Sequence, residues 1–522
     1  MHWAFQIATN LIQQHEDQPT PITCASGVSP SGYVHVGNFR EIATTYFVTR
    51  ALKELGATPR YILSWDDYDR LRKIPKNVTG VAEENIGMPY TKVAPPAGSE
   101  TSAASYGAYF EAMFIDDLAK LNIKPEFIFE TERYENGAYD DELALVLTNR
   151  KKIYDILSRF RTEAANDAER EAYFPISLYC DQCGHDMTTI SAYDEKSQTL
   201  SYECRNCGHH GTQTIGQHQH IKLHWKIDWP MRWRYEKVAF EPGGKDHSSK
   251  NGSFDVAKAI AKEIFDWQAP LYQPYDFVNI KGQTMKMSSS TGNILTLPDL
   301  LSIYTPELVL YLYAKYQPKA QFDLGLDDDV LRNYAEFERL VQKAKTSELD
   351  EMNQQLLMLT GVDLEQTYPS FNHVVSILSL TANNQAIAKD LLKNEAAYTE
   401  EAIDYILERA SYWIENDAKT RLVTINQQPD QKTYEQLPAT VKEQLEKFAQ
   451  LLDAATTLGD DELMQKIYDL SDATDKKEKR TEQKELFSAI YQLTLNQDHG
   501  PRIPLLIKVV GPEKLKQLIL FD

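Results

Sequence analysis

Four of the five cysteines stand in two pairs whose spacing suits a metal ion. The pairs have the form C-x-x-C, are separated by twenty residues, and consist of Cys180, Cys183, Cys204 and Cys207. A glycine follows each pair, so the chain can turn and aim two thiolates at one ion. This arrangement is typical of a zinc ribbon, and the strand-like runs 188–193 and 199–203 predict its hairpin. We therefore predict one structural Zn²⁺, because four thiolates leave no open position for catalysis.

Turn residues follow a short strand near the N-terminus. The apolar, β-branched run 21–26 leads into the loop 27–32, which is rich in glycine, serine and proline. The tetrad His-Val-Gly-Asn at 35–38 comes next, then apolar residues at helical spacing up to Gly56, then a second strand at 60–65. This βαβ unit would present free amides at the helix N-terminus, where phosphate groups bind. A histidine at a helix start is also a common cap, so this pattern alone leaves nucleotide binding open.

A lysine-containing loop further along the chain is the second candidate phosphate site. It follows the strand-like run 275–280 and contains Lys286, Ser288 and Ser289 before a glycine. A lysine ammonium offsets the charge of a polyphosphate, and a loop with hydroxyl groups can close over it. Together with the βαβ unit, this loop indicates a nucleotide-binding fold.

The elements that position these residues predict an α/β protein. The sheet would resume after the cysteine pairs with a strand at 238–240, a glycine loop at 243–244 and an amphipathic helix at 254–267. Beyond about residue 321 helical periodicity dominates, and helices are predicted at 330–345, 373–392, 400–413 and 441–452.

The predicted architecture is a Rossmann-type parallel-sheet nucleotide-binding catalytic domain with a zinc-ribbon insertion, followed by an all-α C-terminal domain. Residues 1–150 would form the first half of the catalytic domain and 151–222 the insertion. Residues 223–320 would form the second half, with the Lys286 loop, and 321–522 the helical region.

Two signatures together carry a resemblance to a known family. His-x-Gly after the first strand, with Lys-Met-Ser-Ser-Ser at 286–290, resembles the paired signatures of class I aminoacyl-tRNA synthetases. Further stretches are similar to the class I lysyl-tRNA synthetases, namely 26–38, 65–73, 228–233 and 240–247. The resemblance is spread from about residue 25 to residue 293 and is thinner in the helical third.

The resemblance implies a two-step reaction. ATP, with Mg²⁺, would activate L-lysine to lysyl-adenylate, and the lysyl group would then pass to the 3′ end of tRNA(Lys). Neither step needs a protein nucleophile, so the enzyme would position reactants and stabilise phosphoryl charge. The insertion would lie near the tRNA acceptor end, and the helical region would bind the anticodon.

The resemblance also implies roles for particular residues. The catalytic set would be His35, Asn38, Lys286, Ser288 and Ser289, and ATP would contact His35, Gly37, Asn38 and Lys286. Lysine would be bound by Gly27, Ser29, Trp225, His247 and Tyr275, with Tyr272 as the alternative aromatic match. Asn38 stands where the family has histidine, and Ser289 where many members have a second lysine, so one positive charge near the phosphates is missing.

Charge and composition limit the other options. The net charge of −21, from 55 basic and 76 acidic residues, argues against a broadly basic nucleic-acid binder, and no DNA partner is expected. No apolar run approaches the ~18 residues that span a bilayer, and the N-terminal stretch lacks a secretory pattern. We therefore expect a cytoplasmic protein with no membrane partner. The basic run 476–480, with Lys484, either contacts RNA phosphates or is a solvated helix face.

Two alternative functions stay open. One is a glutamyl-type class I synthetase, whose pocket would need an arginine for the substrate carboxylate, whereas an ammonium suits oxygen acceptors and aromatic faces. The other is a non-catalytic zinc-ribbon protein that binds nucleic acid.

Overall fold

The chain forms two compact units, Met1–Gly325 with Leu340–Val362 and Leu326–Arg339 with Asp363–Asp522. The computed structural model describes residues 1–16, 21–161, 166–217, 219–283, 287, 294–347, 349–396, 398–455 and 457–521. Within those ranges, no helix has both the length and the apolar character needed to cross a membrane.

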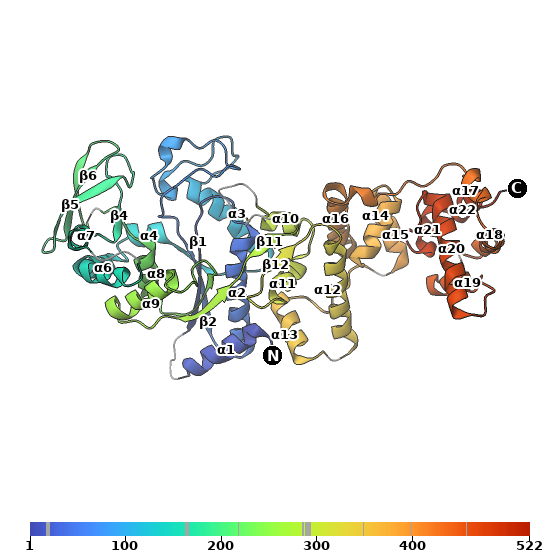
Figure 1. Ribbon diagram of the computed structural model, residues 1–522, viewed down its shortest axis with the longest axis horizontal. Helices are drawn as coiled ribbons and strands as arrows, with labels where there is room; N and C mark the ends of the chain where they lie inside the picture. Colours follow the sequence, from blue (N-terminus) through green and yellow to red (C-terminus); the bar gives the residue numbers. More distant parts are fainter. Residues whose placement is uncertain are drawn as a thin grey trace. The chain divides into compact units, whose positions relative to one another are not determined.

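A five-stranded parallel sheet forms the centre of the first unit (Figure 1). Its order is β10-β9-β1-β2-β3, and every neighbouring pair is parallel. The strands are β1 (Ile22–Val28), β2 (Pro59–Trp65), β3 (Glu126–Phe129), β9 (Val238–Gly244) and β10 (Leu271–Tyr275). The chain moves outward from β1 to β3 and then returns on the other side of β1, so β1 and β9 mark a switch point beside which ligands bind. The predicted Rossmann-type sheet is confirmed.

Helices of the first unit pack on this sheet. α2 (Val36–Glu54) contacts β1, β2 and β9, while α8 (Trp225–Tyr235) and α9 (Ser253–Ile264) share one apolar cluster with the sheet. That cluster joins Ala25 and Ile62 of β1 and β2 to Trp229 and Trp233 of α8. The other helices and turns are α1 (Trp3–Gln14), η1 (Glu83–Asn85), η2 (Tyr90–Lys92), α3 (Tyr106–Lys120), α4 (Glu130–Glu135), α5 (Asp140–Thr148), α6 (Arg150–Ser158), α7 (Asp167–Ala172), α10 (Leu297–Leu301), α11 (Pro306–Ala314) and α13 (Glu351–Thr360).

An insertion between β3 and β9 carries the cysteine pairs. β4 (Ile176–Leu178) pairs antiparallel with β8 (Ile221–Leu223). A three-stranded antiparallel sheet consists of β5 (Thr188–Asp194), β6 (Thr199–Cys204) and β7 (His210–Thr214). The predicted hairpin is therefore confirmed. The sequence does not predict β7, because its five residues, His-Gly-Thr-Gln-Thr, include no apolar side chain to indicate a strand.

Three predicted boundaries are wrong. β1 continues through Gly27 and Val28, in register with β2, and β9 includes the expected loop at 243–244, which pairs with β10. In both places pairing with a neighbouring strand outweighs the local turn preference. The run 275–280 is not one strand, because Tyr275 ends β10 whereas β11 (Val278–Ile280) pairs with β12 (Phe322–Leu324). β12 also lies past residue 320, where only helices are predicted.

Past β12 the described chain is helical. The predicted helix 373–392 is in fact two helices, because Ala382 and Asn383 adopt φ values of +51° and +60° between them and Asn384 caps the second. Besides α13, the described helices and short turn past β12 are α12 (Asp329–Thr346), α14 (Phe371–Leu380), α15 (Gln385–Glu395), α16 (Glu400–Asn416), η4 (Lys419–Arg421), α17 (Gln431–Glu435), α18 (Ala439–Leu452), α19 (Asp460–Tyr468), α20 (Lys476–Leu495), α21 (Ile503–Val510) and α22 (Pro512–Ile519).

Candidate active site and metal centre

A cavity of about 690 Å³ lies at the carboxyl ends of β1, β2 and β9, beside the switch point. Its lining includes eight residues singled out from the sequence, namely Gly27, Ser29, His35, Gly37, Asn38, Trp225, His247 and Tyr275. Met287, from the lysine-containing loop, is buried and lines the same cavity. Lys286, Ser288 and Ser289 lie outside the described residues, so their roles stay predictions.

His35 caps the helix that follows it. Its Nδ1 accepts hydrogen bonds from the backbone amides of Gly37 (3.0 Å) and Asn38 (3.3 Å) at the start of α2. Nδ1 is therefore unprotonated, and in the neutral ring the proton is on Nε2, the atom that can donate to a ligand. A Cβ at Gly37 would lie 2.8 Å from the imidazole, so glycine is required there. The sequence leaves a helix cap and a phosphate contact as alternatives for His35. The structure shows the cap at Nδ1, and a phosphate contact would use the other nitrogen, Nε2.

Glu41, which the sequence analysis misses, joins two of the predicted lysine-binding residues. It lies on α2, lines the cavity, and accepts hydrogen bonds from the Gly27 amide (3.0 Å) and the Tyr275 hydroxyl (2.8 Å). Burial raises the pKa of the Glu41 carboxyl to about 8. The sequence signal is weak, because acidic residues are common near the N-terminus of any helix.

Aromatic rings line one wall of the cavity. Trp225 and Trp229, four residues apart on α8, stack with 5.1 Å between their ring centroids. The ring of His247 lies 5.9 Å from that of Trp229. Tyr275 lines the cavity, whereas its alternative, Tyr272, packs against the cluster that α8 and α9 form with the sheet. The wall therefore offers aromatic faces to a ligand.

Among the described residues, two carboxyl groups that line the cavity lack a cation beside them, although the exposed Arg72 also lines it. Its buried cation, Arg232, forms ion pairs at 2.9 Å with Asp66, 3.1 Å with Glu130 and 3.2 Å with Asp228. Glu241 also lines the cavity, accepts a hydrogen bond from the Trp233 indole (2.5 Å), and has a pKa raised to about 7 by burial. Within the described part of the chain, neither Glu41 nor Glu241 has an ion-pair partner. A cationic ligand would thus meet two carboxyl groups that lack a counter-charge.

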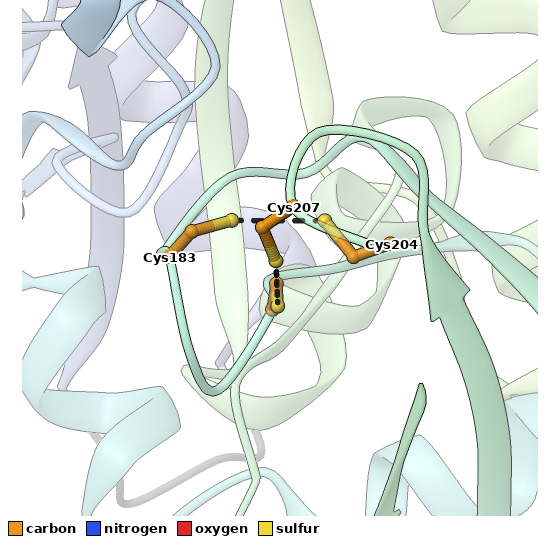
Figure 2. A group of neighbouring side chains, drawn as sticks. Cys183, Cys204 and Cys207 are labelled. Carbon is orange, nitrogen blue, oxygen red and sulfur yellow. Dashed lines mark hydrogen bonds between the residues drawn. The ribbon is translucent and has the colours of Figure 1, made fainter. Parts of the chain in front are cut away.

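The four paired cysteines converge on one point. Their Sγ atoms all lie within 4.8 Å of one another, and Figure 2 shows the sulfurs of Cys183, Cys204 and Cys207 turned toward a common centre. Cys180 and Cys207 are 3.7 Å apart at Sγ, and Cys183 and Cys204 are 3.6 Å apart. A tetrahedral zinc ion with Zn–S bonds of about 2.3 Å requires sulfur separations of about 3.8 Å. The donor set therefore fits Zn²⁺ held by four thiolates.

Metal analysis of the purified protein is expected to give one zinc per chain. Cys207→Ser should lower that content, because it removes one of four ligands. His210→Ala should leave it at one, because the histidine lies beside the second cysteine pair and outside the cluster. Inductively coupled plasma mass spectrometry measures both. Two zinc ions per chain, or a loss of zinc in His210→Ala, would contradict the four-thiolate site.

Comparison with known proteins gives matches over the whole chain. Residues 1–362 match the model of the family described as tRNA synthetases class I (K). A lysine–tRNA ligase from Treponema pallidum is 34% identical over 539 residues, which cover 99% of this chain and 98% of the relative. A lysine–tRNA ligase from Thermococcus kodakarensis is 32% identical over 521 residues, with 96% of each chain covered. The crystal structure of a glutamate tRNA ligase from Elizabethkingia meningosepticum, in complex with its amino acid, covers 96% of this chain and 98% of that chain at 13% identity and a TM-score of 0.43.

Proposed function

Because this chain belongs to the family of class I tRNA synthetases (K), we propose that it is a lysine–tRNA ligase. The lysine carboxylate attacks the α-phosphorus of ATP, and pyrophosphate leaves. A ribose hydroxyl at the 3′ end of tRNA(Lys) then attacks the acyl carbon of lysyl-adenylate, and AMP leaves. Mg²⁺ accompanies ATP. We place this reaction in the cytoplasm, where tRNA is charged.

The observation that favours lysine over glutamate is the charge of the cavity. A substrate ammonium can pair with Glu41 or Glu241, which lack a cation within the described residues, and can lie against the face of Trp225. The γ-carboxylate of glutamate would need a free buried arginine. Arg232 is already paired with three carboxylates, so it is not available for that role.

We assign the ATP side of the cavity to the start of α2. His35 and Asn38 lie there, at the positive end of the helix dipole, and the Nε2 atom of His35 and the side chain of Asn38 would contact the phosphates. Lys286 would supply positive charge from the second loop. Arg72 is exposed, lines the same cavity and has no ion-pair partner in the described structure, so it can replace the charge that Ser289 lacks.

The tRNA acceptor end is assigned to a second cavity beside the first. This cavity, of about 610 Å³, lies against the insertion and shares Asp69, Arg72 and Trp225 with the active-site cavity. A 3′-terminal ribose held there would be next to the adenylate. Trp225 offers a surface on which an unstacked base can pack.

RNA contact in the second unit is assigned to a basic groove on α20. Lys476, Lys477, Arg480 and Lys484 line this groove of about 700 Å³. All four are exposed, and none forms an ion pair with a described residue. Lys479, on the same helix, is paired with Asp469 at 3.3 Å. In a chain of net charge −21, four unpaired cations on one helix suit a phosphate backbone.

Lys477→Ala/Arg480→Ala/Lys484→Ala is expected to raise the KM for tRNA about tenfold at ~0.1 M salt and to flatten its salt dependence. The KM values for lysine and ATP should not change, because α20 lies outside the active-site unit. Aminoacylation kinetics at several salt concentrations measure this. Lys479→Ala is the matched control. If the triple variant and the control have the same KM for tRNA, the groove does not bind RNA.

Pyrophosphate exchange tests the proposed function. Exchange with ATP and Mg²⁺ is measured for each of the twenty amino acids, with and without total tRNA, because activation can require bound tRNA. Lysine-dependent exchange is expected. Glutamate-dependent exchange would agree with the family but show that the substrate is glutamate and not lysine. No exchange in either condition, with folded and zinc-loaded protein, would favour a non-catalytic zinc-ribbon protein.

A further inference from the structure

One margin of the active-site cavity is a segment with little regular structure. Residues 66–90, here called the rim segment, follow β2 and carry three residues that line the cavity, Asp66, Asp69 and Arg72. The segment folds back on itself: the Leu71 amide donates to Met88 (2.8 Å), and the Gly87 amide donates to Leu71 (2.9 Å). Leu71, Val78 and Tyr90 also pack into an apolar cluster with Tyr106 and Phe110 of α3, so one side of the segment is anchored by that cluster.

A second set of contacts comes from the turn that holds the first cysteine pair. Residues 180–186, here called the ligand turn, reach both arms of the rim segment. Asp186 pairs with Arg70 at 2.6 Å, and its amide donates to the carbonyl of Gly87 (2.9 Å). His185 Nε2 lies 2.8 Å from the carbonyl oxygen of Glu84. Next to the turn, the Tyr179 hydroxyl donates to the carbonyl of Tyr68 (2.7 Å).

The contact between the two segments is close. Gly87 has a φ of +103°, and a Cβ there would lie 3.3 Å from both His185 and Asp186. The Asp186 side chain is 7% exposed, whereas that of Arg70 is 49% exposed, so the ion pair is shielded from solvent on its carboxylate side only. A buried carboxylate that loses its cation costs far more than an exposed one. The Arg70–Asp186 pair thus adds an ion pair to the hydrogen bonds between the segments.

The ligand turn takes its shape from the cysteine pair. The Gly184 amide donates to Cys180 (2.8 Å), the Cys180 amide donates to His185 (2.9 Å), and His185 Nδ1 lies 2.9 Å from the Cys183 carbonyl oxygen. The same backbone conformation therefore aims two sulfurs at the metal and aims residues 185–186 at the rim segment. The second cysteine pair has no such role, since no hydrogen bond or ion pair joins residues 204–208 to the rim segment in the described chain.

We propose that the metal centre braces the active-site cavity through the ligand turn, and that Asp186 and Arg70 are positioning residues for Arg72 and Asp69. This inference rests on the proposed function for its kinetic consequence. The metal does not take part in the chemistry. It holds the turn, the turn holds both arms of the rim segment, and the rim segment carries Arg72, the exposed cation that we assign to the phosphates of ATP beside Lys286.

Hydrogen–deuterium exchange of the full-length, zinc-loaded protein tests the brace. Asp186→Asn and Arg70→Leu break the link from opposite sides and are compared with the parent. Both variants should retain one zinc and exchange the amides of residues 66–90 about tenfold faster. The amides of β5 and β6 should exchange as in the parent. His210→Ala, on β7 of the same ribbon, should change neither region. If the amides of the rim segment exchange in Arg70→Leu at the same rate as in the parent, the proposal is overturned.

Kinetics and zinc removal complete the test. The KM for ATP should rise about fivefold in both variants with kcat within about twofold, because a misplaced Arg72 weakens binding of the nucleotide. Arg70→Lys should restore the parental KM. Chelation of the zinc should loosen the rim segment in the parent, and continued protection after complete zinc loss would overturn the role of the metal. If the parent shows no lysine-dependent pyrophosphate exchange, the proposed function fails. The hydrogen–deuterium exchange of residues 66–90 would still test whether the metal centre supports the rim segment.

Discussion

Glu41→Gln is expected to lower kcat/KM for lysine activation about a hundredfold, mainly through a higher KM. Glutamine keeps the size of the side chain and the hydrogen bond from the Gly27 amide but cannot take the negative charge that Glu41 carries when it pairs with the substrate ammonium. Removing one partner of a buried charge pair costs about 2–5 kcal/mol, and a hundredfold corresponds to about 2.7 kcal/mol. Steady-state pyrophosphate exchange with lysine as the varied substrate measures the effect.

Glu54→Gln, at the exposed end of the same helix, is the control and should behave as the parent. Tyr275→Phe removes only the hydroxyl that donates to Glu41 and should have a smaller effect than Glu41→Gln. If Glu41→Gln leaves the KM for lysine within about twofold of the parent, Glu41 is not the counter-charge of the substrate ammonium.

The same carboxyl makes lysine binding depend on pH. Burial raises the pKa of Glu41 to about 8, so in the free protein this carboxyl is protonated below pH 8. Pairing it with an ammonium releases the proton. The KM for lysine should therefore fall by up to about tenfold per pH unit as the pH rises toward about 8, and then become constant. The ammonium of free lysine, with a pKa near about 10.4, stays charged throughout. In Glu41→Gln this component of the pH dependence should be absent.

Arg232→Met is expected to destabilise the first unit by about 3–5 kcal/mol, because it leaves buried carboxylates without their cation. Arg232 is buried on α8 and pairs with Asp66, Glu130 and Asp228. Asp228 would retain Lys222 at 3.3 Å, but Asp66 and Glu130 would lose their nearest positive charge. Urea unfolding followed by tryptophan fluorescence reports on this region, since three tryptophans lie on the same helix.

Arg234→Met is the matched control. Arg234 lies on the same helix, is 39% exposed, and pairs with Glu142 at 2.7 Å. An exposed ion pair of this kind contributes about 1 kcal/mol or less. Equal losses in the two variants would show that the buried network does not depend on Arg232.

The deficit of Arg232→Met should grow with pH. The Arg232 guanidinium lowers the pKa of both Asp66 and Glu130, against the effect of burial. Without it, the pKa of each carboxyl rises further above its value in the unfolded chain. A carboxyl whose pKa is raised in the folded state stabilises the protein at low pH, and this stabilisation is lost as the pH rises. The free energy of unfolding of the variant should therefore approach that of the parent near about pH 5 and be furthest below it at about pH 8.

Features that depend on neighbouring residues are predictable from the sequence. The C-x-x-C spacing predicts the four-sulfur cluster because two residues of chain separate the ligands within each pair. Helical and strand periodicity predicts α2, β2 and the ribbon hairpin because each follows from side chains on one face of one element. The same periodicity does not predict the break between α14 and α15, because the apolar pattern continues across residues 382–384 although the backbone turns there.

By itself, the sequence determined the ribbon and the βαβ unit of this protein. Only the tertiary structure decided the charge of the cavity. Glu41 lines the cavity with two hydrogen-bond partners because the order of the sheet brings Gly27 of β1 and Tyr275 of β10 to the same helix. Arg232 is neutralised by one carboxylate that follows β2, one that follows β3, and one on its own helix. These contacts join residues up to 234 positions apart, and no local spacing encodes them.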